Sequence, residues 1–334
     1  MSDIPAALPQ DQAAAVDAYF TCELATISKS GIPIAWPVVT LRREDGTFLI
    51  TTSIGAPQKA FNIRREPKVG MLFSDPTGSG HTTLPEILIQ GTAVCPDEIV
   101  TAVAELEPYW IKLWRRQPPL ALGGRSALRG LVDFYYMRLL ITVTPEQVTE
   151  RPPLDTLIRP KAATTGPAPV PPSASKAFTR TNAALTAYRS AVLATVDPDG
   201  FPSLRRVRLT PDPSGEAFLI DAPATAVPHP GPASILCHRH DDTLQNQYSF
   251  VTLGRVESRS GAWAFIPTRF IQGSGGDNPL GAIRKVIAVR RATKRYLSAR
   301  SLPRPRIPWE DLDALYRQVT RSTPDGSAET TRPY

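Results

Sequence analysis

The sequence predicts a mostly β (α+β) chain in which two small β-barrels follow each other in tandem, with peripheral helices. First, a unit is repeated: LATISKSGIP (24–33) recurs as LATVDPDGFP (193–202), and LIQGTAVC (88–95) is echoed by VTLGRVES (251–258). Second, 35 prolines in 334 residues disfavour long helices. Third, apolar runs of four to eight residues alternate with turn dipeptides, which is typical of strands.

Each element of the first repeat has a local reason. Turn dipeptides such as Ser30-Gly31 and Asp45-Gly46 supply the positive φ that tight hairpins need, so they separate strands. A helix spliced into an antiparallel meander favours a small, partly open barrel over a sandwich. In order, we expect a helix at 10–21, strands at 22–28, 33–42 and 47–52, a helix at 57–65, strands at 68–74 and 86–95, a helix at 97–115 and a strand at 134–143.

The repeats define the expected domains. The first barrel occupies 1–155, and the second, with C-terminal basic helices, occupies 178–321. Between them, 156–177 is rich in Pro and Ala, a composition typical of a semi-rigid linker. The last residues, 322–334, are expected to be disordered.

Charge and cysteine content bear on ligand and compartment. The net charge of +7 favours an anionic ligand but does not choose between a nucleic acid and a small phosphate. No run approaches the roughly 20 apolar residues of a membrane-spanning helix, and the N-terminal segment lacks the features of a secretion signal. An odd number of widely spaced cysteines, three in all, predicts a reducing, cytoplasmic location.

The segment TTSIGAPQKAFNIRREPKV (51–69) is the strongest candidate for chemistry. A strand ends in Thr51-Thr52-Ser53, and after a Gly-Ala-Pro turn a helix begins that carries Lys59 and Asn62. Hydroxyls, backbone N–H groups and a cation at a helix N-terminus can bind an anion. Alternatively, the hydroxyls only cap the helix and Lys59 is solvated; the spacing alone leaves both open.

Three stretches together resemble a known family. GIPIAWPVVTL (31–41), FLITTSIGAPQKAFNIRREPKVGMLFSDP (48–76) and LIQGTA (88–93) are similar to the pyridoxamine 5′-phosphate oxidase-like, flavin-binding split β-barrel family. The similarity covers about 15–145 and, more weakly, about 180–270. Because family members are usually dimers with flavin at the subunit interface, two repeats imply an intramolecular pseudo-dimer, either monomeric or further paired as a homodimer.

The resemblance implies FMN as cofactor and assigns roles by position. The phosphate would be held by Thr52, Ser53 and Lys59, in the helix that also carries Asn62, while Gln90 would contact the ring or the ribityl chain. The isoalloxazine would lie along Trp36, Pro37, Val38 and Val39.

The second repeat departs from this pattern. Thr-Thr-Ser is replaced by Asp221-Ala222-Pro223, and the prolines that follow exclude the Lys-x-x-Asn helix. Its strand 202–209 resembles the family strand whose arginine approaches the flavin. We therefore expect one full cofactor site per chain, built mainly by the first repeat and walled by Arg205, Arg206 or Arg208 of the second.

Two other patterns compete for function. His238 and His240 would share one face of a strand and could bind zinc or iron, but no further metal spacing accompanies them, so we expect a strand end and no metal. The segment 278–309 contains many arginines and lysines and no acid, so a basic helix there could follow the phosphates of a nucleic acid. No nucleic-acid recognition motif accompanies that charge, which favours a solvated helix face.

These features predict an FMN-dependent oxidoreductase acting on a small molecule, with NAD(P)H as a candidate reductant. Two alternatives stay open: a flavin-binding sensor without turnover, and a reductase that uses a deazaflavin coenzyme on the same fold. No catalytic residue can be nominated from the sequence, since no Ser-His-Asp or Cys-His arrangement is visible.

Overall fold

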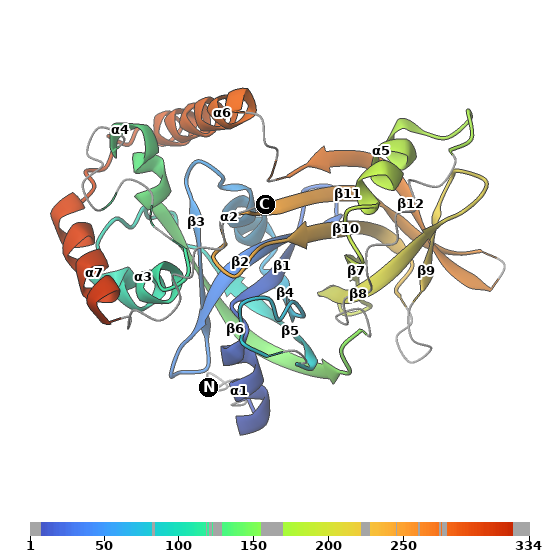
Figure 1. Ribbon diagram of the computed structural model, residues 1–334, viewed down its shortest axis with the longest axis horizontal. Helices are drawn as coiled ribbons and strands as arrows, with labels where there is room; N and C mark the ends of the chain where they lie inside the picture. The colour runs from blue at the N-terminus through green and yellow to red at the C-terminus, as the bar shows by residue number, and fades with distance from the viewer. Residues whose placement is uncertain are drawn as a thin grey trace, which may run out of the picture.

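The computed structural model shows two closed, six-stranded antiparallel barrels with one strand order (Figure 1). The structure describes residues 8–81, 84–117, 119, 122, 129–154, 170–221, 228–244, 246–259, 261–273, 275 and 279–322. Barrel one consists of β1 (Thr21–Ile27), β2 (Pro33–Arg42), β3 (Phe48–Ser53), β4 (Lys68–Phe73), β5 (Glu86–Val94) and β6 (Arg138–Arg151), in the spatial order β1-β2-β3-β6-β5-β4.

Barrel two repeats that order as β7-β8-β9-β12-β11-β10. Its strands are β7 (Ala191–Val196), β8 (Pro202–Pro211), β9 (Phe218–Asp221), β10 (Gly231–Arg239), β11 (Tyr248–Arg259) and β12 (Ala262–Gln272). The tandem α+β barrel prediction is confirmed. The expectation of a partly open barrel is wrong, because antiparallel pairing of β1 with β4, and of β7 with β10, closes each sheet.

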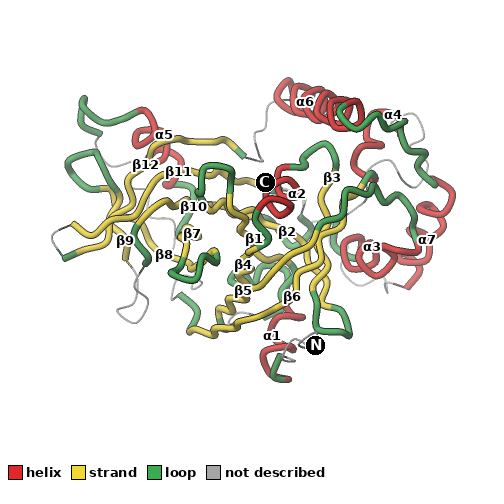
Figure 2. Tube along the Cα trace, turned by 180° about the vertical axis from the view of Figure 1, so that it is seen from behind, coloured by secondary structure: helices red, strands yellow, loops and turns green. Residues whose placement is uncertain are grey.

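The helices lie at the periphery, as predicted. They are α1 (Gln10–Ala18), α2 (Gln58–Arg65), α3 (Glu107–Trp114), α4 (Arg129–Val132), α5 (Lys176–Leu185), α6 (Pro279–Ser298) and α7 (Trp309–Ser322), with 3₁₀ turns η1 (Ala104–Leu106) and η3 (Asp133–Tyr136). Although α6 and α7 follow barrel two in the chain, they pack against barrel one, where α7 contacts α3 (Figures 1 and 2).

Two predicted elements of barrel one need correction. The helix expected at 97–115 begins only at Glu107, because Val100 pairs with Arg138 in an isolated β-bridge and Pro108 fits the first helical turn. The strand expected at 134–143 begins at Arg138, after η3, and continues to Arg151 because it pairs first with β3 and then with β5.

Direct packing of the two barrels confirms the intramolecular pseudo-dimer. One buried apolar cluster combines residues of both barrels, including Ala25 and Leu72 with Val192 and Leu236. The backbones approach so closely that a Cβ on Gly70 would clash with the carbonyl oxygen of Pro202.

The remaining expectations concern connections and membrane helices. Residues 156–169 of the expected linker (156–177) and 323–334 of the expected tail (322–334) lie outside the described residues, as do 222–227 between β9 and β10. The end of the expected linker already belongs to α5, and the first residue of the expected tail to α7. Within the part of the chain that the structure describes, no helix combines the length and apolar content needed to cross a bilayer.

Candidate functional site

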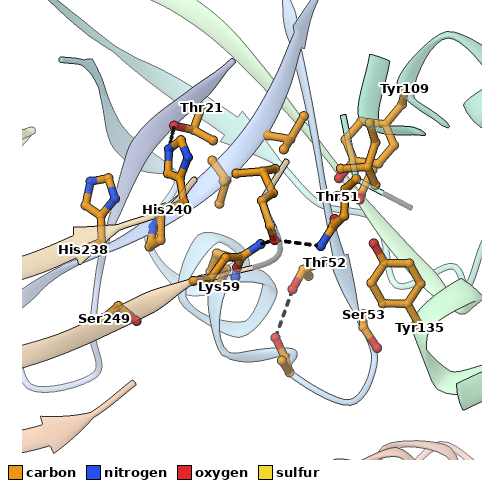
Figure 3. A pocket seen from close by; sticks show the side chains of 18 of the residues that line it. Thr21, Thr51, Thr52, Ser53, Lys59, Tyr109, Tyr135, His238, His240 and Ser249 are labelled. Atoms are coloured by element: carbon orange, nitrogen blue, oxygen red, sulfur yellow. Dashed lines mark hydrogen bonds between the residues drawn. The ribbon is translucent and has the colours of Figure 1, made fainter. Parts of the chain in front are cut away.

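A cavity of about 400 Å³ lies where the two barrels meet (Figure 3). Barrel one contributes β2, the β3–α2 turn, α3 and the start of β6; barrel two contributes the end of β10 and the start of β11. The lining residues are Thr21, Pro37, Val38, Val39, Thr51, Thr52, Ser53, Ala56, Lys59, Tyr109, Leu113, Gln117, Tyr135, Arg138, His238, Arg239, His240, Leu244, Gln247, Tyr248 and Ser249. The volume is within the range of small-ligand sites.

The predicted hydroxyls of the β3–α2 turn reach this cavity but also hold the turn together. Thr52 Oγ1 donates to the carbonyl of Ala56 at 3.0 Å, and Ser53 Oγ donates to the carbonyl of Phe134 at 2.6 Å. Neither hydroxyl caps α2, whose N-cap position is Pro57 with no side-chain cap hydrogen bond. The capping alternative therefore does not account for them. Both hydroxyls have committed their protons, and Ser53 Oγ also accepts from the N–H of Gly55 at 3.1 Å, so each oxygen keeps acceptor capacity but less of it remains on Ser53.

Lys59 is the cation of the cavity that the sequence singled out. Its Nζ lies 5.4 Å from the ring centroid of Trp36, and no carboxylate among the described residues lies within 4 Å of it. Burial, and secondly the positive charge of Arg138, lower the pKa of Lys59 to about 8. A partly buried ammonium without a counter-ion is unfavourable, and a bound anion would relieve it.

Arg138 is a second cation, which sequence reasoning did not single out. Its Nε and Nη2 donate to Thr51 Oγ1 at 2.9 and 2.5 Å, and its Nη1 donates to the carbonyl of Tyr135 at 3.1 Å. The guanidinium also faces the rings of Tyr135 and Trp110, at 5.2 and 5.6 Å. A lone arginine in the apolar run YYMRLLITV was the available signal.

Aromatic and apolar groups complete the wall on the barrel-one side. Pro37, Val38 and Val39 line it from β2, whereas Trp36 does not line it and instead packs its ring beneath Lys59. Tyr135 stays neutral because burial raises its pKa to about 12, so its hydroxyl can donate a hydrogen bond.

Barrel two supplies the opposite wall. His238, near the end of β10, and His240, directly after it, lie beside Thr21 on the side of the cavity away from Tyr109 and Tyr135 (Figure 3). Arg239 is a third cation at the cavity wall, and its guanidinium lies 4.7 Å from the Tyr248 ring centroid.

Four further residues of the predicted set lie away from this cavity. Asn62 belongs to the protein interior, and Gln90 to the contact between the barrels. Asn62 is fully buried and donates to Thr26 Oγ1 at 2.9 Å. Gln90 bridges the barrels, donating to Asp197 Oδ2 at 2.7 Å.

Arg205 and Arg206, which were expected to wall the cofactor site, also lie away from the cavity. Arg206 donates to Glu23 Oε1 at 2.9 Å in a buried ion pair between the barrels. Arg205 is 9% exposed, and burial, followed by the charge of Arg151, lowers its pKa to about 10. The structure thus brings Thr52, Ser53 and Lys59 together with Pro37, Val38 and Val39, and places Asn62, Gln90, Arg205 and Arg206 within the protein framework.

Comparisons with known proteins found neither a matching family model nor a similar curated protein. Among solved structures, a conserved hypothetical protein from Mycobacterium tuberculosis is 23% identical, with a TM-score of 0.32, covering 50% of this chain and 97% of its own. A putative pyridoxamine 5′-phosphate oxidase from Listeria innocua is 16% identical, with a TM-score of 0.29, covering 42% and 94%. A protein named F420 reductase is 19% identical, with a TM-score of 0.31, covering 42% and 98%.

These similarity values are too low to support an argument about function. The fold follows from the strand order in the structure itself, which repeats in both halves of the chain. Each half of the chain forms a closed six-stranded barrel with the same strand order, and the two barrels share a buried apolar cluster.

Proposed function

We propose that the cavity between the barrels binds FMN and that the protein is an FMN-dependent oxidoreductase acting on a small molecule. The main support for this proposal is that two cations, Lys59 and Arg138, line the cavity on the barrel-one side. No carboxylate among the described residues lies within 4 Å of either. Two such cations suit a phosphate dianion, since a charge-assisted hydrogen bond contributes about 1.5–3 kcal/mol.

The rest of the cavity suits the other parts of this cofactor. Pro37, Val38 and Val39 offer an apolar strand for a flat ring, with backbone groups available at its polar edge. Neutral Tyr135 offers a hydroxyl, and the hydroxyl oxygens of Thr52 and Ser53 can accept from ligand hydroxyls.

Bound FMN would supply hydride or electron transfer, while the protein sets geometry and electrostatics. In this chain, Lys59 and Arg138 would anchor the phosphate, and the β2 strand would orient the ring. Residues of barrel two, from His238 to Ser249, would shield the opposite side from water. A small substrate, with NAD(P)H as the candidate reductant, would approach from the part of the cavity that FMN leaves open.

Two alternatives keep the same site. A flavin-binding sensor would hold FMN without turnover. A deazaflavin coenzyme is favoured by one specific observation, the position of Arg239 at the cavity wall, where it could attract a longer anionic tail.

The test is an absorption spectrum and a mass analysis of whatever co-purifies, followed by FMN titration. Lys59→Ala should weaken FMN binding by about 1.5–3 kcal/mol. Lys68→Ala is the matched control, because Lys68 donates to the carbonyl of Asp199 outside the cavity and should leave FMN binding unchanged.

The outcomes separate the hypotheses. Bleaching of bound FMN by NAD(P)H supports turnover, whereas stable yellow protein supports a sensor. Colourless protein that binds only a deazaflavin supports the second alternative. Equal FMN affinity of Lys59→Ala and the unaltered protein would refute the site.

A further inference from the structure

We propose that Asp75, His238 and His240 form a binding site for a divalent first-row transition metal ion where the two barrels meet. Asp75 follows β4 of barrel one, whereas in barrel two His238 lies near the end of β10 and His240 directly follows it. Asp75 Oδ2 lies 3.9 Å from His238 Nδ1 and 3.7 Å from His240 Nε2, and one ligand atom from each residue lies within 4.8 Å of the others.

The first argument is that one ring nitrogen of each histidine contacts an oxygen acceptor, which orients the other nitrogen toward the proposed metal. His238 Nε2 lies 2.7 Å from Glu23 Oε1, and His240 Nδ1 lies 2.9 Å from the carbonyl oxygen of Asp241. Each of these nitrogens faces an oxygen acceptor and so carries the proton, which leaves the opposite nitrogen of each ring unprotonated: His238 Nδ1 has no hydrogen-bond partner, and His240 Nε2 contacts only the Thr21 hydroxyl. Metal-binding histidines are oriented by partners of this kind.

The second argument is an unsatisfied buried atom. His238 is 7% exposed, and its Nδ1 is buried with no hydrogen-bond partner in the structure. Such an atom is costly unless something binds it. His238 Nδ1 faces Asp75 Oδ2. The N–H of Thr77 donates to the other carboxylate oxygen, Oδ1, and no described residue donates to Oδ2.

The distances are close to those that a metal requires. Three ligands at about 2.1 Å from a tetrahedral ion lie about 3.4 Å apart, so the side chains need to move inward by about 1 Å or less on average. His240 Nε2 also lies 3.2 Å from Thr21 Oγ1, whose hydroxyl can rotate to donate elsewhere. His238 and His240 line the cavity, which gives these two side chains room for such a movement.

A purely ionic explanation fits less well. A protonated His238 would join Glu23 and Asp75, but its 3.9 Å separation from Asp75 is too long for a hydrogen bond. Glu23 already pairs with Arg206 at 2.9 Å, so the charge without a close, hydrogen-bonded cation is that of Asp75. A divalent ion would balance it.

The ligand set indicates which metals fit. Two imidazoles and one carboxylate suit zinc, iron(II) and their neighbours, whereas calcium and magnesium prefer oxygen ligands. Three protein ligands leave a coordination position for water or for a ligand in the cavity that His238 and His240 line.

The experiment titrates chelator-treated, full-length protein with Zn²⁺ by calorimetry, and with Co²⁺ to detect its ligand-field absorption bands. We expect one Zn²⁺ per chain, with no competition from Ca²⁺. Asp75→Asn and His240→Gln should each weaken Zn²⁺ binding by at least tenfold. His229→Gln is the matched control, because His229 precedes β10 and lies outside the cluster.

Melting temperatures of each variant establish that the fold is intact, and His238→Gln is avoided because that ring contacts the buried Glu23. Zn²⁺ binding at less than half an equivalent, or an equal loss in His229→Gln, would overturn the proposal. So would unchanged Zn²⁺ affinity in both Asp75→Asn and His240→Gln. Lys59→Ala should retain Zn²⁺, which separates failure of this site from failure of the FMN site.

Discussion

Raising the pH should weaken FMN binding through a single group, Lys59. Its pKa in the free protein is lowered to about 8, so the ammonium is about 90% charged at pH 7 and about 9% charged at pH 9. A phosphate monoester, with its second pKa near 6, remains largely a dianion over this range. If bound phosphate keeps Lys59 charged, the Kd for FMN should rise about tenfold between pH 7 and pH 9, or about 1.4 kcal/mol.

Quenching of flavin fluorescence measures this affinity at each pH. Riboflavin, which lacks the phosphate, should show a flat profile, and so should FMN with Lys59→Arg, because a guanidinium stays charged at pH 9. A tenfold loss that persists in Lys59→Arg, or that appears equally with riboflavin, would refute the assignment of the phosphate to Lys59.

Three further variants test the framework, each by denaturant unfolding. Glu23→Gln should destabilise the protein by about 3–5 kcal/mol, because it removes the charge of a fully buried carboxylate that pairs with Arg206. Asp17→Asn, in an exposed pair, should cost less than about 1 kcal/mol. Gly70→Ala should cost about 1–3 kcal/mol by overpacking the barrel contact, while Gly130→Ala, with open space around the added methyl group, should not. Lys59→Met should stabilise the FMN-free protein at pH 7, because it removes a buried charge. In the unaltered protein, stability should rise between pH 8 and about 10.5, where the unfolded chain binds one proton more than the folded protein. This rise should be absent in the variant.

Much of the fold could be predicted because its signals are local. Turn glycines and apolar alternation placed β1 to β5 within a residue or two, and β2 was expected at 33–42, where it lies. The β3–α2 turn, with Lys59 facing the cavity, was likewise expected from its own residues. Repetition of a sequence unit revealed the second barrel even where individual motifs had diverged.

The parts that could not be predicted depend on contacts between distant segments. Arg138 reaches the cavity because β6 pairs with β3, which brings it to Thr51, 87 residues away in the chain. His238 and His240 gain their third partner, Asp75, only when barrel two packs on barrel one. Spacing within one strand shows two imidazoles and cannot show a carboxylate from the other repeat.

Joining both barrels in one polypeptide has a consequence for how the cavity can change. In a dimer of identical subunits, every substitution occurs twice, once in each equivalent interface. Here the wall built from β10 and β11 is encoded separately from β4 and β5, its counterparts in barrel one. Each side of the pocket can therefore acquire its own chemistry while the other copy remains free to serve as scaffold.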